Sequence, residues 1–250
     1  MCGLAGCVKK AKVNVLVGQA FISDFHTAFP EDNKPHKDIR GLYLREFVPR
    51  VIDYCLTHNY QYDLLTMPEM TFPPWFNNLQ QAQSQKLWFL SQHNRYDYFL
   101  WLDVDVLVHP NSPAFPFSEG FTAVLDCVSS RAGILSKYRY VQVPFDRYCN
   151  SGVWGIDSLS AKKLWENGVN KLLDGRYREY EGDDMLDQSL LNQLVCENGV
   201  PHNLVKDEWN TLICGPLWNN RHQSHFVHYA GGQGDKHIRV TGDLKHNTSL

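Results

Sequence analysis

The sequence predicts a single α/β domain with a mixed, mostly parallel central sheet flanked by helices. Short apolar runs rich in β-branched and aromatic residues alternate with longer segments of helical periodicity. The links between these segments are short, as is typical of βαβ units. The chain of 250 residues also contains no internal repeat and no low-complexity linker, so one domain is the simplest organisation.

The first part of the chain favours alternating strands and helices. Five elements are expected in the order strand, helix, strand, helix, strand: residues 12–17, 38–58, 60–65, 79–93 and 98–109. Pro49 is expected to kink the first helix, and Gly18-Gln19-Ala20 should form a turn after the first strand. Ligands of such folds bind at the carboxyl ends of the parallel strands, so this turn is a candidate binding element.

The second half of the chain is less regular. Strands are expected at 121–128, 152–156, 202–205 and 225–229, and helices at 160–173 and 183–196. Ser158 or Ser160 marks the start of the first of these helices, and Asn198-Gly199 closes the second. We expect the folded domain to span residues 12–240, between an N-terminal tail at 1–11 and a C-terminal tail at 241–250.

Composition excludes several classes of partner. The 24 basic and 27 acidic residues give a net charge of -3, which disfavours binding to nucleic acid or to an anionic membrane. No apolar run approaches the length of a transmembrane segment, and the first residues lack the order of a signal peptide. Seven cysteines without a Cys-x-x-Cys pair argue against a disulfide framework and a zinc site. We therefore expect a cytoplasmic protein that acts on small molecules.

Two aspartates, Asp103 and Asp105, end the apolar run that begins at Tyr98. On a strand these carboxylates would point to the same side, and in buried surroundings they need a partner of opposite charge. Hard oxygen ligands suit Mg²⁺ or Mn²⁺, whose remaining positions are commonly filled by the phosphates of a substrate. The pattern thus indicates a metal and diphosphate site. The alternative is a pair of carboxylates that cap the next turn or pair with a lysine.

Three further patterns follow in the chain: Asn150-Ser-Gly-Val-Trp-Gly-Ile156, Asp183-Asp-Met-Leu-Asp187-Gln188-Ser-Leu-Leu and His225-Phe-Val-His228-Tyr-Ala-Gly231-Gly. Together with the Asp-x-Asp motif they resemble the nucleotide-sugar glycosyltransferases of the GT-A fold. The resemblance is greatest to the retaining enzymes of family 8, related to glycogenin and bacterial galactosyltransferases, and to the galactosyl- and xylosyltransferases of family 34. It extends from Val13 to Lys236.

The resemblance implies a role for each matching residue. Asp103, Asp105 and His228 would bind Mn²⁺ or Mg²⁺, with Asp103 also close to the donor, a UDP-sugar. Asp187 and Gln188 would contact the donor sugar as the catalytic pair. The other expected donor-binding residues are Gly18, Gln19, Ala20, Lys86, Asn150, Gly231 and Lys236.

Each of these residues also has a structural interpretation. Lys86 would then be a solvated helix lysine, His228 a satisfied histidine in a strand, and Asp187 a favourable charge at a helix start. The sequence also departs from family 8, because Lys236 comes five residues after Gly231 and Ser189 follows the Asp-Gln pair, as in family 34. A compact domain without an anchor is similar to transferases of large algal viruses, which would place the protein in the host cytoplasm, and a bacterial source is equally open.

These observations predict a metal-dependent glycosyltransferase that moves a sugar from a nucleoside diphosphate, UDP in our expectation, to a saccharide hydroxyl with retention. Inversion would need a carboxylate base, for which Asp146, Asp207 or Glu208 are available. A phosphohydrolase of the haloacid dehalogenase type is the main alternative enzyme, and a sugar-nucleotide pyrophosphorylase would need a basic, glycine-rich loop after its first strand. A noncatalytic sugar-binding or scaffold protein is the alternative from another class.

Overall fold

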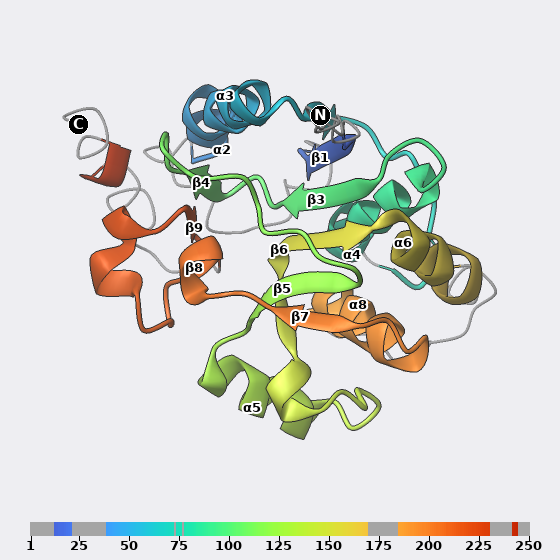
Figure 1. Ribbon diagram of the computed structural model, residues 1–250. Coiled ribbons are helices and arrows are strands. Elements are labelled where there is room, and N and C mark those ends of the chain that lie inside the picture. Colours follow the sequence, from blue (N-terminus) through green and yellow to red (C-terminus); the bar gives the residue numbers. More distant parts are fainter. Residues whose placement is uncertain are drawn as a thin grey trace, which may run out of the picture.

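The computed structural model describes residues 13–21, 39–72, 74–76, 78–169, 185–230 and 242–244. The larger sheet consists of β1 (Val15–Ala20), β2 (Gln61–Leu65), β3 (Tyr98–Leu102), β5 (Phe121–Leu125), β6 (Cys149–Asp157) and β7 (His202–Leu204). Their order across the sheet is β2-β1-β3-β6-β5-β7, and β6 runs antiparallel to both of its neighbours while the other pairs are parallel. The predicted mixed, mostly parallel α/β architecture is therefore confirmed (Figure 1).

Helices cover both faces of this sheet. They are α2 (Ile39–Leu42), α3 (Val48–His58), α4 (Asn78–Gln83), α5 (Val128–Lys137), α6 (Ser158–Leu164) and α8 (Leu186–Glu197). A π-helical turn (Tyr43–Phe47) joins α2 to α3, a second one (Trp165–Val169) follows α6, and a 3₁₀-helix (Ser84–Gln92) continues α4. On α3, Val51 packs with Val17 and Leu100 on one face of the sheet. The opposite face buries Leu16 and Phe99 against α6, α8 and the 3₁₀-helix. Strands buried on both faces explain the continuous apolar runs of the sequence.

A smaller sheet lies beside the carboxyl end of β3 (Figure 1). It consists of β4 (Val106–Val108), β9 (Phe226–His228) and β8 (Thr211–Leu212), in the order β4-β9-β8. The strand predicted over 98–109 is thus wrong in its length, because the chain turns after Leu102 and continues in the other sheet. Since β4 pairs antiparallel with β9, Val106 lies opposite His228.

Several local predictions differ from the structure. Gly18-Gln19-Ala20 lies inside β1 rather than in a turn. A Cβ atom on Gly18 would lie 2.3 Å from the Phe89 ring, so the glycine serves close packing. The N-cap of α6 is neither Ser158 nor Ser160 but Asp157, whose side chain accepts a hydrogen bond from the Ser160 N–H.

Other elements begin or end at unexpected positions. The strand predicted over 121–128 ends at Leu125 and is followed by α5, and β8 was not predicted. Pro49 lies in the first turn of α3, where its missing N–H is tolerated, and the predicted helix is π-helical just before it, at Tyr43–Phe47. The predicted domain limits at 12 and 240, together with Gly231 and Lys236, lie outside the described residues.

The sequence argued against a disulfide framework, but one pair of cysteines is joined in the structure. Cys127, just before α5, and Cys214, after β8, form a disulfide, and their Cα atoms are 5.9 Å apart. Spacing alone could not reveal this pair, because it depends on the approach of two distant loops. Among the helices of the described residues, none has the length and apolar character needed to cross a bilayer.

Candidate metal and donor site

Two carboxylates and an imidazole converge where β3 ends. The Asp103 N–H donates to the Gly152 carbonyl of β6 (2.7 Å), and the Val106 N–H donates back to the Asp103 carbonyl (3.0 Å). This turn brings Asp103 and Asp105 together, whereas the sequence suggested strand alternation. The last residue of β9, His228, completes the group, and one ligand atom from each side chain lies within 4.8 Å of the others.

One oxygen of Asp103 is already committed within the protein. Its Oδ1 accepts from the Trp101 indole N–H (2.6 Å) and pairs with Lys86 Nζ (3.2 Å). Asp103 Oδ2 lies 3.9 Å from His228 Nε2, which is itself 3.2 Å from Asp105 Oδ1. The Asp103 and Asp105 side chains are 30% and 19% exposed, so a ligand can reach them. Lys86 therefore pairs with Oδ1 of Asp103 and does not block access to the two carboxylates.

The remaining donor atoms suit a divalent cation. Two carboxylate oxygens and one imidazole nitrogen form a set that Mn²⁺ accepts readily, and Mg²⁺ accepts its oxygen members. Without a cation or a proton between them, acceptor atoms at this spacing would repel each other. The residues present thus fit the metal that the sequence predicts, although metal binding itself stays a prediction.

Gly152 makes room for the histidine of this cluster. A Cβ atom at this position would lie 2.0 Å from His228 Cε1 and 2.5 Å from Nδ1, so any side chain would displace the imidazole. The sequence contains the signal for this residue in its Asn-Ser-Gly pattern. Its spatial reason is visible only in the fold.

The variant Gly152→Ala is expected to lose at least about tenfold in Mn²⁺ affinity, because the displaced ring no longer faces the carboxylates. Titration of free Mn²⁺ by electron paramagnetic resonance measures this loss. Gly133→Ala is the matched control, since nothing lies within 4 Å of its added Cβ in α5. An unchanged affinity in Gly152→Ala would mean that His228 does not take part in metal binding.

Lys86 is a buried cation rather than a solvated helix lysine, being only 2% exposed. Its Nζ donates to Asp187 Oδ2 (2.6 Å), to the Ser151 carbonyl (3.2 Å) and to the Ser151 hydroxyl (3.2 Å). Burial alone would lower the pKa of Lys86, but the charges of Asp103 and Asp187 outweigh it and raise that pKa. Lys86 therefore stays charged and joins the metal motif to Asp187.

Asp187 lies in the first turn of α8 and is also buried. Burial by itself would raise the pKa of its carboxyl, yet the neighbouring Lys86 charge and the Ser151 hydroxyl hold that pKa below its usual range. The carboxylate is thus ionised next to the metal motif. Its predicted contact with a donor sugar stays a prediction.

Gln188 and Asn150 form hydrogen bonds with other groups of the protein. Gln188 is fully buried, and its Oε1 accepts from Asn150 Nδ2 (3.0 Å) and from the Ser151 N–H (3.0 Å). Its Nε2 donates to Asp126 Oδ2 (3.0 Å), a residue that the sequence analysis did not single out. The predicted contacts of Gln188 and Asn150 with the donor remain untested.

The predicted donor residues of β1 contribute in different ways. Gln19 is fully buried, donates to the Asp103 carbonyl (3.3 Å) and accepts from the Tyr62 hydroxyl (2.9 Å). It therefore supports the backbone of the metal motif. Gly18 packs against Phe89, and Ala20 ends the strand with partial exposure.

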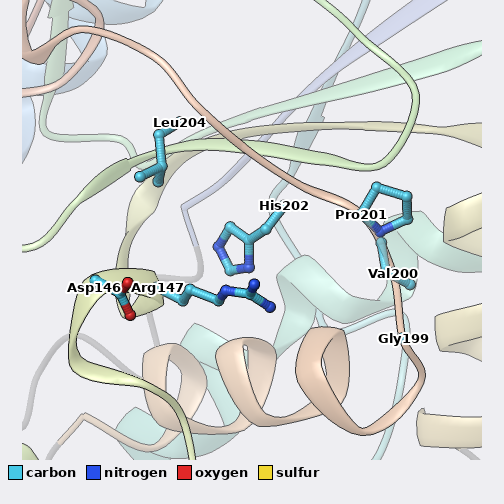
Figure 2. Close-up of a pocket in the computed structure, with 7 residues that line it drawn as sticks. All are labelled: Asp146, Arg147, Gly199, Val200, Pro201, His202 and Leu204. Atoms are coloured by element: carbon cyan, nitrogen blue, oxygen red, sulfur yellow. The ribbon is translucent and has the colours of Figure 1, made fainter.

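A pocket of about 460 Å³ lies away from these residues, at β7. Its lining comprises Asp146, Arg147, Gly199, Val200, Pro201, His202 and Leu204. Figure 2 shows the Arg147 guanidinium next to the His202 imidazole. None of its lining residues belongs to the cluster of carboxylates and imidazole, so we do not assign the donor to it.

His202 gives this region a measurable pH dependence. Burial lowers the pKa of its imidazole to about 4, and the Arg147 charge adds to the effect. Its Nε2 lies 3.3 Å from Cys149 Sγ, and burial raises the pKa of that thiol. A protonated thiol therefore meets a neutral imidazole.

Below a pH of about 6.5 the unfolded chain binds a proton at His202 while the folded protein does not. We expect this group to remove about 2 kcal/mol of stability as the pH falls from 6.5 to 4, after allowance for its partial exposure. Urea unfolding of wild type and His202→Gln at pH 7 and 4.5 isolates the contribution. Parallel pH profiles for the two proteins would contradict it.

Comparison with known proteins gives a fold but no close relative. No protein-family model matches the chain, and no curated protein matches it. A glycosyltransferase involved in the glycosylation of the major capsid of PBCV-1 is similar, with 14% identity, a TM-score of 0.57, and coverage of 96% of this chain and 100% of that one. Galactosyltransferase LgtC, in complex with donor and acceptor sugar analogs, shows 16% identity and a TM-score of 0.55, with 95% and 96% covered.

The bifunctional glycosyltransferase WbbM shows 15% identity and a TM-score of 0.54, with 95% of this chain matching 50% of that one. Each of these similarities extends over nearly the whole of the present chain. They concern structures of low sequence identity and therefore establish architecture. The chain has the GT-A fold that the sequence motifs predicted.

Proposed function

We propose that this protein is a metal-dependent glycosyltransferase that moves a sugar from a nucleoside diphosphate, UDP in our assignment, to a saccharide hydroxyl. The observation that carries the proposal is the cluster of Asp103, Asp105 and His228 at the carboxyl end of a central strand. In open α/β sheets, this edge is where ligands bind. The named activities of the structures with the same fold support it.

The residues divide the work by charge. Asp103 Oδ2, Asp105 and His228 would hold Mn²⁺ or Mg²⁺, which when bound stabilises the charge that develops on the departing diphosphate. Lys86 pairs with both Asp103 and Asp187 and so reduces the repulsion between these carboxylates. Asp187 would accept a hydrogen bond from a hydroxyl of the donor sugar.

We propose retention of the anomeric configuration on the strength of the resemblance to families 8 and 34. Gly231 and Lys236, which lie outside the described residues, are proposed to bind the diphosphate. We assign no general base. Neither the phosphohydrolase nor the scaffold alternative finds support in the proteins that share this fold.

A screen of nucleotide sugars for slow hydrolysis in Mn²⁺ tests the proposal. The expected result is metal-dependent release of sugar from a UDP-sugar, with an initial product anomer, read by NMR, that matches the donor. An inverted product would overturn retention alone. No hydrolysis of any donor, together with no shift in melting temperature by Mn²⁺ plus UDP, would overturn the transferase.

The same melting assay separates the alternatives. A transferase should be stabilised more by Mn²⁺ and UDP together than by the sum of their separate effects, because the cation and the diphosphate would bind next to each other and strengthen each other's binding. A phosphohydrolase would respond instead to beryllofluoride, a mimic of a phosphoryl group. A scaffold without a working pocket would respond to neither.

A further inference from the structure

A chain of hydrogen bonds connects a buried carboxylate to the histidine of the metal cluster. It begins at Asp126, directly after β5, whose Oδ1 accepts from the Cys127 N–H (2.9 Å). Asp126 Oδ2 accepts from the Ser130 hydroxyl and from Gln188 Nε2. In the second of these bonds the Gln188 amino group is the donor and the carboxylate oxygen is the acceptor.

The orientation of the Gln188 amide is determined by contacts at both its nitrogen and its oxygen. The backbone N–H of Ser151 only donates, so the Gln188 atom that it contacts must be the carbonyl oxygen. The same Oε1 accepts from Asn150 Nδ2 (3.0 Å). The orientation of Gln188 therefore follows from its neighbours and not from an arbitrary choice between oxygen and nitrogen.

Asn150 is fixed by the same reasoning. With its amino group donated to Gln188, its Oδ1 accepts from the Gly152 N–H (2.9 Å) and from Asn210 Nδ2 (2.9 Å). This oxygen also lies 3.1 Å from His228 Nδ1. A carbonyl oxygen only accepts, so Nδ1 must carry a proton.

The proton on Nδ1 determines what the other ring nitrogen of His228, Nε2, can bind. His228 Nε2 faces Asp105 Oδ1 at 3.2 Å, and a carboxylate oxygen at this distance tolerates either a proton or a cation on Nε2. A neutral imidazole with its proton on Nδ1 has its lone pair on Nε2, the atom that points to the two aspartates. This is the form that binds a metal ion.

We propose that Asn150 is a positioning residue that keeps the proton of His228 on Nδ1, with its own amide oriented by Gln188 and Asp126. This proposal rests on the proposed metal site. It gives Asn150 and Gln188 a role behind the metal ligands, in addition to any contact with the donor. Asp126 and Gly152 also belong to the site, because their hydrogen bonds hold the amides of Gln188 and Asn150 in place.

The proton position is measured directly by long-range ¹H–¹⁵N spectra of ¹⁵N-histidine-labelled protein, without metal and with Mg²⁺, the His228 signals being assigned with His228→Asn. Wild type should show a protonated Nδ1 in both conditions. In Asn150→Ala, Asp105 is the remaining acceptor, so the proton should move to Nε2. In Asn150→Asp, which keeps an acceptor for Nδ1–H, it should stay on Nδ1. An unprotonated Nδ1 in wild type would overturn the proposal.

Mn²⁺ affinity provides a second readout. Asn150→Ala should bind Mn²⁺ at least about tenfold more weakly, and Asn150→Asp should stay within about threefold of wild type. Asn192→Ala is the matched control: Asn192 is another fully buried asparagine that bonds Cys149 and the Gln188 carbonyl, without a bond to His228. Equal losses in Asn150→Ala and Asn192→Ala would reduce the role of Asn150 to packing and overturn the proposal.

These outcomes separate the inference from the function on which it rests. If Nδ1 is protonated as expected but Mn²⁺ does not bind wild type, the metal-dependent function fails while the hydrogen-bonded chain stands. If Mn²⁺ binds wild type and Asn150→Ala equally well, the inference fails alone. If Asn150→Ala does not fold, the wild-type spectrum and the Asn150→Asp variant still test the proposed role of Asn150.

Discussion

The variant Asp105→Ala is expected to lose metal-dependent donor binding and sugar transfer while keeping its fold. Asp103 shares one oxygen with Lys86 and Trp101, so the removal of Asp105 leaves the cation with one carboxylate oxygen and the imidazole. We expect a loss of Mn²⁺ affinity of at least about 100-fold and a similar or larger loss of turnover, because several kcal/mol of charge stabilisation disappear. Calorimetry with Mn²⁺ and UDP measures the first, and product formation the second.

The control for this variant is Asp53→Ala, which removes an exposed aspartate of α3. It should leave both binding and turnover unchanged. The folded state of Asp105→Ala is checked by circular dichroism and by its melting temperature in the absence of metal. Undiminished turnover in Asp105→Ala would refute the assignment of the metal site.

The variant Lys86→Met is expected to lower the free energy of unfolding by about 3–5 kcal/mol. The substitution removes the cation that pairs with Asp187 at 2.6 Å and leaves a buried carboxylate with the Ser151 hydroxyl as its remaining side-chain donor. Turnover should fall as well, since Asp103 loses the same partner. Denaturant unfolding at constant m-value measures the loss of stability.

Two further variants show whether the charge is the cause. Lys86→Met combined with Asp187→Leu should recover much of the lost stability, because a pair of apolar side chains replaces an isolated charge, but it should not recover turnover. Lys162→Met removes an exposed lysine, 49% accessible and 3.7 Å from Glu166, and should change stability by less than about 0.5 kcal/mol. A wild-type unfolding midpoint in Lys86→Met would contradict the ionic network.

The sequence anticipated the architecture because burial on both faces of the sheet leaves a clear pattern. Val15 and Val17 pack on one side while Leu16 packs on the other, so the run is apolar throughout. The pattern did not reveal where the run from Tyr98 divides, because a turn through Asp-Val-Asp and a continuous strand look alike locally. The division depends on the pairing of Val106 with His228, a contact between distant parts of the chain.

The sequence also indicated the charged residues of the candidate site, but not the groups that support them. Charged groups in apolar surroundings need partners, and this led to Asp103 and Asp105, whereas Lys86 was expected only from the resemblance to family 8. The groups behind them were not anticipated, because Asp126 and Gly152 matter only through three-dimensional contacts. The Gly18 prediction failed for the same reason, since its glycine accommodates the Phe89 ring and not a turn. Local chemistry thus identifies the charges, while the supporting contacts require the fold.

The most direct test of the metal site is anomalous diffraction at the manganese edge from crystals grown with Mn²⁺ and UDP. We predict one strong peak within coordination distance of Asp103 Oδ2, Asp105 and His228 Nε2, with the diphosphate of UDP on its open side. A structure with bound UDP, no peak at this position and Lys86 paired with both oxygens of Asp103 would contradict the account.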